Sequence, residues 1–178
     1  KEQLGFREGL AETVNGQRVR DWIREGGAAE DEFLGSDKLG ALVRSRHHFH
    51  NPLLPWEQAG LSVLSGQASV RWAQNLNQGL SGQAAWGDAR QALYEALTLP
   101  SKSERDRRWA DTFRFLGQQM HLVADLAVRA HTRNDAHIVE DGFEAWAERN
   151  SAVVQTLIAG PSITPSPEIF KVGVPIED

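Results

Sequence analysis

The stretch that decides the fold is SERDRRWADTFRFLGQQMHLVADL, residues 103–126. Its large apolar residues recur every three or four positions, which is the spacing of one face of an α-helix. These residues are Trp109, Phe113, Leu116, Met120 and Val123. We therefore predict a long amphipathic helix over about residues 103–126, the longest helix in the chain.

The rest of the chain is also rich in Ala, Leu, Glu, Gln and Arg, which favour helices, and strand-like alternation is scarce. Gly, Asn and Pro separate the further helices that we expect. Their ranges are 3–13, 17–25, 36–46, 67–78, 87–98 and 135–150. We predict an all-α, multi-helix fold, with residues 1–160 as a single domain. The proline-rich residues 161–178 are expected to form a tail or an extension.

The composition is that of an ordinary globular domain, with 178 residues, 40% apolar and 24% charged. The net charge of -5 argues against a broad basic surface for duplex nucleic acid, but not against a metal-held phosphate. Because there is no cysteine, His, Asp and Glu must provide any zinc ligands. No stretch has the roughly 18 apolar residues of a membrane span, and no signal peptide is present. Since the chain begins at Lys1, we expect a processed or trimmed chain.

All six histidines lie in two short regions, residues 47–50 and 121–137. Two of them have an aspartate four positions later: His121 precedes Asp125, and His137 precedes Asp141. On a helix such residues share a face, so an imidazole and a carboxylate can bind one metal ion from the same side. Gly117 lies one turn before His121, where its missing side chain leaves room for another backbone or a ligand.

A single pair of this kind is usually a solvated surface pair, and that alternative stands for each pair alone. The segment around His121 and Asp125 is otherwise apolar, and buried polar side chains there need partners. His131 can join the same site only if the helix ends near residues 127–130 and the chain turns back, because a continuous helix would carry it about 15 Å further along.

Four segments, in order, resemble the signature of the zinc-dependent phospholipases C and single-strand-specific zinc nucleases. Leu116-Gly117, His121, Asp125 and His131 resemble the family's Leu-Gly-x-x-x-His-x-x-x-Asp and the His six residues after it. His137 and Asp141 resemble its later His-x-x-x-Glu/Asp pair. HFHNP at 48–52 looks like its His-Phe-Tyr-Asp-Pro segment, and GAAED at 27–31 is similar to its Gly-Ala-x-x-Asp element. The resemblance covers residues 27–141.

The resemblance implies a phospholipase C/nuclease-like bundle with metals between the helices and two zinc sites from this chain. The first site would be formed by Asp31, His48, His121 and Asp125, and the second by His131, His137 and Asp141. A third family zinc uses an N-terminal Trp and a nearby His. This chain has no His before His47 and no Trp before Trp22, so a third site is expected only with a missing N-terminal segment.

The implied function is zinc-dependent hydrolysis of a phosphate ester, most simply a phosphodiester, by a metal-activated water. Asp31 is the implied catalytic residue that orients or deprotonates the nucleophile. The 27–31 and 48–52 segments resemble the bacterial phospholipase branch more closely, which favours a phospholipid substrate over single-stranded nucleic acid. A non-catalytic helical binding module is the alternative from another class. The family's usual secretion implies a periplasmic or extracellular location, and no oligomeric state follows from the sequence.

Three further residues have two interpretations each. Arg129 stands where the family usually has Pro; it is expected to face solvent, or else to contact a substrate phosphate. His47 and His50 flank the presumed ligand His48 and are expected to lie behind the ligands or to be exposed.

Overall fold

A computed structural model describes residues 6–31, 43–79, 82–136 and 142–158 of the chain. These residues are mainly helical, which confirms the predicted fold class. The chain divides into two compact units, Lys1–Ala136 and His137–Asp178, and each is described by itself. The expected tail at 161–178 lies outside the described residues.

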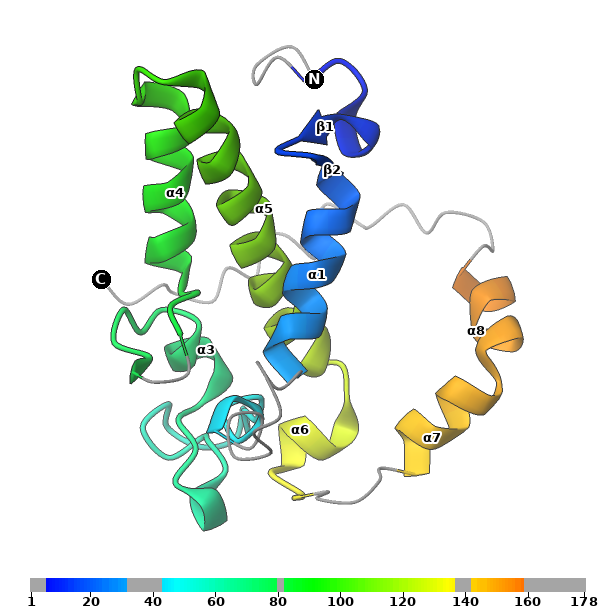
Figure 1. The fold of residues 1–178 in the computed structure, drawn as a ribbon. Helices are drawn as coiled ribbons and strands as arrows, with labels where there is room; N and C mark the ends of the chain where they lie inside the picture. Colours follow the sequence, from blue (N-terminus) through cyan, green and yellow to red (C-terminus); the bar gives the residue numbers. More distant parts are fainter. Residues whose placement is uncertain (1–5, 32–42, 80–81, 137–141, 159–178) are drawn as a thin grey trace, which may run out of the picture. The chain divides into compact units, whose positions relative to one another are not determined.

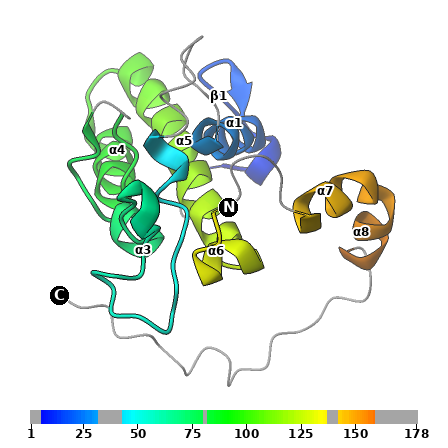
Figure 2. The ribbon, with the colours of Figure 1, turned by 90° about the horizontal axis from the view of Figure 1, so that it is seen from below.

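Three long helices of the first unit lie side by side: α1 (Val19–Asp31), α4 (Trp86–Thr98) and α5 (Lys102–Asp125) (Figures 1 and 2). Helix α5 packs against both α1 and α4. The helices predicted at 87–98 and 103–126 are thus present with ends that differ by one residue. Apolar residues at helical spacing predict long helices of this kind well.

An apolar core joins the N-terminal halves of α1 and α5. The Trp109 and Phe113 rings stack at 5.7 Å between centroids, and Phe6 meets the Trp109 ring edge-on at 4.8 Å. The predicted apolar face of α5 does not stay in this core along its whole length, since Met120 is 52% exposed and Val123 is 68% exposed. Beyond Leu116 the buried residues of the helix are Gly117, Gln118, Leu122 and Asp125, so polar side chains join the buried face while Met120 and Val123 leave it.

Helix α1 does not stop at Gly26-Gly27, so the prediction of a helix over 17–25 was wrong at its C-terminal end. A Cβ atom on Gly26 would lie 1.9 Å from the Arg114 carbonyl oxygen, and one on Gly117 would lie 2.0 Å from the Ile23 carbonyl oxygen. Both glycines therefore serve the close crossing of α1 and α5. The space expected beside Gly117 is occupied by the backbone of another helix.

The helix predicted at 3–13 is absent from the described residues 6–13. A 3-10 turn at Gly9–Ala11 leads instead into a hairpin of β1 (Thr13–Val14) and β2 (Gln17–Arg18). Asn15 and Gly16 connect the strands with positive φ angles of 48° and 86°. This Asn-Gly pair favours a two-residue hairpin turn, and that preference outweighs the helical composition of the preceding residues.

Residues 43–79 form a largely irregular segment that contains a helical turn at residues 43–45 and the short helices η2 (Ser62–Leu64) and α3 (Ser69–Trp72). The helix predicted at 67–78 is therefore much shorter than expected, and most of the one predicted at 36–46 lies outside the described residues. Backbone hydrogen bonds fix the segment: the His50 amide donates to the His131 carbonyl, and the Ser69 amide donates to the Phe49 carbonyl.

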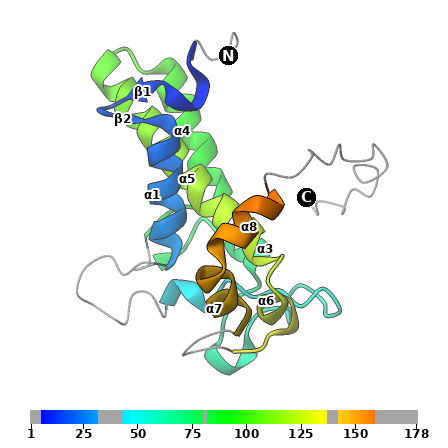
Figure 3. The same ribbon diagram turned by 90° about the vertical axis from the view of Figure 1, so that its right-hand side faces the viewer.

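The chain turns sharply after α5, which is the condition under which His131 can join the site. Helix α5 ends at Asp125, Val128 is extended, and α6 (Arg129–Arg133) begins in a new direction (Figure 3). Asn134 ends α6 in a left-handed conformation with a φ of 56°. Helix α5 ends at Asp125, slightly before residues 127–130, so the condition for His131 to approach the site is met, and the turn brings His131 back toward the end of α5.

The second unit contains α7 (Gly142–Arg149), which lies within the helix predicted over 135–150, and α8 (Ser151–Ile158), which was not predicted. Asn150 separates the two helices. Within the described part of the chain, no helix is both long and apolar enough to cross a membrane.

Candidate metal centre

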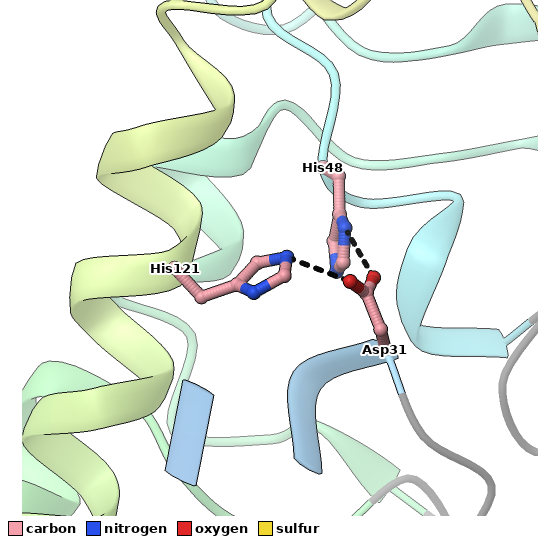
Figure 4. A group of neighbouring side chains, drawn as sticks. All are labelled: Asp31, His48 and His121. Carbon is pink, nitrogen blue, oxygen red and sulfur yellow. Dashed lines mark ion pairs between the residues drawn. The ribbon is translucent and has the colours of Figure 1, made fainter. Parts of the chain in front are cut away.

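Three side chains from distant segments meet at one end of α1 and α5. Asp31 is the last residue of α1, His48 follows the helical turn at residues 43–45, and His121 lies in the last part of α5. Figure 4 shows the three side chains directed toward one another. One ligand atom from each lies within 4.8 Å of the other two. This group could hold a metal ion.

Asp31 bridges the two imidazoles from the open side of the group. One of its carboxylate oxygens lies 3.3 Å from His48 Nδ1, and the other lies 3.3 Å from His121 Nε2. The Asp31 side chain is 58% exposed, whereas those of His48 and His121 are 3% and 18% exposed. The site is therefore open to solvent at Asp31.

Asp125 closes the group from the protein side. It lies one helical turn after His121, and its Oδ2 is 3.3 Å from His121 Nε2 and 3.0 Å from His48 Nδ1. Its other oxygen, Oδ1, lies 3.4 Å from Nδ1 of His131. Asp125 thus stands between the group of Asp31, His48 and His121 on one side and His131 on the other.

Close contact does not satisfy all of these atoms. Among the described residues, His121 Nε2 and Asp125 Oδ2 are buried and have no hydrogen-bond partner, although they lie 3.3 Å apart. Buried polar atoms without partners are rare, because burial costs them their bonds to water. Their convergence indicates a site that a bound group completes.

The charges within the site are strongly coupled. Burial alone would lower the pKa of His121, but the carboxylates of Asp125 and Asp31 outweigh it and raise the pKa to about 10. Burial likewise opposes a raised pKa for His48, and the contacts with Asp125 and Glu30 overcome it. For Asp125, burial is outweighed by His121, His131 and His48, which hold its pKa well below the usual range. Without a metal, protonated imidazoles face ionised carboxylates.

Sequence analysis missed a buried polar network directly behind the site. Glu30 is fully buried and accepts hydrogen bonds from Arg44, Trp72 and Gln118. Burial would raise the pKa of Glu30, but contacts with His48 and Arg44 lower it to about 2. Glu30 lies inside the GAAED segment beside Asp31, so its place was visible, but nothing in the sequence marked it as buried.

The remaining predicted residues have different outcomes. His137 and Asp141 lie outside the described residues, so the second predicted set is represented here by His131. Arg129 is exposed at the start of α6. His47 and His50 are both buried, so the alternative that they are exposed is wrong.

His47 has a structural environment of its own. Its ring stacks on Trp72 at 3.9 Å, and its Nδ1 accepts a hydrogen bond of 2.7 Å from the Gln67 amide. Burial, with the Arg46 charge, lowers the pKa of His47 to about 4. His47 is therefore neutral near pH 7 and is held by Trp72, Gln67 and Arg46.

No protein-family model, no curated protein and no solved structure matches the chain. Fold and site define a mainly helical protein whose Asp31, His48 and His121 could hold a metal ion.

Proposed function

We propose that the protein is a zinc-dependent phosphoesterase with phospholipase C-like activity on a phosphodiester. The observation that carries the proposal is the convergence of Asp31, His48, His121 and Asp125, which come from three separate segments. These are the residues that the family resemblance assigns to one zinc ion, and helical spacing independently pairs His121 with Asp125.

The donor set and its spacing suit zinc. In a tetrahedral site with bonds of 2.0–2.2 Å, ligand atoms lie about 3.3–3.6 Å from one another. The contacts of His48 and His121 with Asp31 and Asp125 span 3.0–3.3 Å. Imidazole nitrogen and carboxylate oxygen are both good zinc ligands. Asp31, His48, His121 and Asp125 would hold one ion, and His131 with His137 and Asp141 would hold another.

A bound zinc ion supplies positive charge for phosphate oxygens and acidifies a water ligand. The chain contributes the remaining parts. Asp31 is the exposed carboxylate of the site, so it can both touch a substrate and accept the proton of the attacking water. Asp125 is buried and keeps the two imidazoles together, which suits it to holding the ligands rather than to proton transfer with solvent.

An apolar groove favours a phospholipid over single-stranded nucleic acid as the substrate. The groove has a volume of about 500 Å³ and runs along α5. Leu122 and Leu126 line it, and each follows a site residue, His121 or Asp125, in the sequence. Such a surface suits the apolar part of a lipid, whereas a single-stranded nucleic acid needs basic and aromatic surface.

Zinc analysis and two substrates test the proposal. We expect the full chain, purified with zinc present, to contain about two zinc ions, and to release phosphocholine from phosphatidylcholine faster than it digests single-stranded DNA. Asp31→Asn is expected to retain the fold and to lose the activity. No zinc after zinc-replete purification would contradict the proposal. Bound zinc without either activity would instead favour the non-catalytic binding module.

A further inference from the structure

Glu30 is a fully buried carboxylate at the end of α1, directly before Asp31. Arg44 binds both of its oxygens, with Nη2 at 2.7 Å from Oε2 and 3.0 Å from Oε1, and Nε at 3.1 Å from Oε2. Gln118 donates to Oε2 at 3.0 Å, and Trp72 donates to Oε1 at 3.3 Å. Donors from three separate segments therefore fix this carboxylate.

Stability alone does not explain the Glu30–Arg44 pair. Both side chains are at most 5% exposed, so both charges have lost their hydration. The attraction within a buried pair often no more than offsets that loss, and apolar residues of similar volume are often as stable there. A pair retained in such a place suggests that the carboxylate serves a neighbour.

The neighbour is His48, whose two nitrogens face opposite sides. Nδ1 lies 3.0 Å from Asp125 Oδ2 and 3.3 Å from Asp31 Oδ1, on the side of the candidate metal centre. Nε2 faces Glu30 Oε1 at 3.7 Å. Nε2 is buried and, within the part of the chain that the structure describes, makes no hydrogen bond. The His48 ring thus stands between the metal ligands and Glu30.

We propose that Glu30 is a positioning residue that fixes the His48 ring and its tautomer. The His48 Nε2 proton is directed to Glu30 Oε1, which leaves Nδ1 as the bare nitrogen that faces the metal. A carboxylate behind a ligand histidine makes it a stronger and better oriented ligand. This inference rests on the metal site of the proposed function, but it adds a group that touches neither metal nor substrate.

The surrounding hydrogen-bond donors fix the orientation of the Glu30 carboxylate. Oε2 accepts three bonds, two from Arg44 and one from Gln118, while Oε1 accepts one from Arg44 and a longer one from Trp72. Oε1 therefore accepts fewer bonds than Oε2, and it is the oxygen that faces His48 Nε2 at 3.7 Å. Gln118 lies on α5 one residue after Gly117, where α5 and α1 cross closely. The helix crossing therefore also places a donor on Glu30.

The test compares zinc affinity in the full-length wild type and variants, by competition with a chromogenic chelator. We expect Glu30→Gln to weaken zinc binding about 10- to 100-fold. Glu30→Asp, which keeps the charge, should recover part of the loss. Glu57→Gln is the matched control: Glu57 forms an exposed pair with Arg71 at 2.8 Å, and its loss should change zinc affinity less than about twofold.

Glu30→Gln leaves the Arg44 charge buried without its counter-charge, which can prevent folding. Glu30→Met with Arg44→Met removes both charges together, and this folded variant should show the same 10- to 100-fold loss, roughly. Long-range ¹H–¹⁵N spectra give a readout that a merely structural role would not move. In zinc-loaded wild type the His48 Nε2 proton should be visible and slow to exchange, and in the double variant it should exchange rapidly.

Wild-type zinc affinity and an unchanged Nε2 proton in the double variant would overturn the inference and leave the proposed function intact. A wild type that binds zinc without hydrolysing either substrate would refute the proposed function, while the affinity comparison would still decide the role of Glu30. A wild type that binds no zinc would refute both.

Discussion

The two halves of α5 face the same partner, α1, with opposite chemistry. In the N-terminal half, Trp109 and Phe113 pack in an apolar cluster with Val14 and Val19. In the C-terminal half the buried face carries Gln118 and Asp125, together with the partly buried His121. One helix therefore supports an ordinary core at one end and a cluster of ionisable groups at the other.

The apolar half of the helix stabilises the fold, whereas the polar half holds the ionisable groups of the candidate metal centre. Each large side chain in the apolar half contributes roughly 1.5–3 kcal/mol by burial. The polar half brings together groups whose burial costs free energy unless they are paired. Between the halves, Gly26 and Gly117 let the two backbones touch. The apolar half therefore stabilises the fold, and the two glycines allow the close crossing at which the polar groups meet.

The largest effect is expected from Gly117→Ala at this crossing. The added Cβ would lie 2.0 Å from the Ile23 carbonyl oxygen, and backbone atoms cannot move aside cheaply. We expect a loss of more than about 4 kcal/mol in unfolding free energy, or no folding, measured by urea denaturation. Gly27→Ala is the control, because its Cβ would meet the Gly117 carbonyl oxygen at an ordinary 3.7 Å. Equal stability of the two variants would contradict the close crossing.

A smaller loss is expected from Phe113→Ala in the apolar half. Removing a buried aromatic ring costs about 3–5 kcal/mol, and this ring is 9% exposed, so about 3 kcal/mol is expected in urea denaturation. Zinc affinity of the folded variant should stay within about twofold of the wild type, since distant sites act independently. A large fall in zinc affinity would show that the two halves are coupled.

His121→Ala is expected to act mainly on zinc binding. Loss of this imidazole should weaken zinc binding at least about 100-fold, or about 2.7 kcal/mol, measured by chelator competition. Near pH 7 the zinc-free variant should also lose stability, because Asp125 and Asp31, which raise the pKa of His121, lose the imidazolium that pairs with them. His50→Ala serves as the histidine control and should bind zinc normally. A His121→Ala variant with unchanged zinc affinity would remove His121 from the ligand set.

The smallest effect is expected from acid. Because the pKa of His47 is lowered to about 4, the folded state favours the neutral ring. Its contribution is complete above pH 6.5 and is lost as the pH falls from 6.5 to about 4, where the unfolded chain binds the extra proton. We expect zinc-free protein to lose roughly 2–3 kcal/mol over this range, since one pKa unit corresponds to about 1.4 kcal/mol.

His47→Gln should flatten that loss, whereas Phe113→Ala should leave it unchanged, because the Phe113 ring carries no titrating group. Unfolding curves recorded at several pH values provide the measurement. A slope of equal size in His47→Gln would assign the acid sensitivity to another group.

Local patterns predicted α4 and α5 well, and the turn before His131 followed from helix geometry. The same reasoning failed where local signals have two meanings. Gly26-Gly27 was interpreted as a helix end, although the close approach of α5 explains it. Asn15-Gly16 was interpreted as the end of a helix, although it forms a hairpin turn. A glycine in a sequence does not show which neighbour it accommodates.

The sequence by itself determined the helical class, the long helix α5 and the identity of His48, His121, Asp125 and Asp31 as candidate ligands, because helical spacing and motif order are properties of the chain alone. The tertiary structure decided that these side chains meet, that Asp31 is the exposed one, and that Glu30 is buried behind His48. Those facts depend on distances between residues far apart in the chain, which spacing along the sequence does not contain.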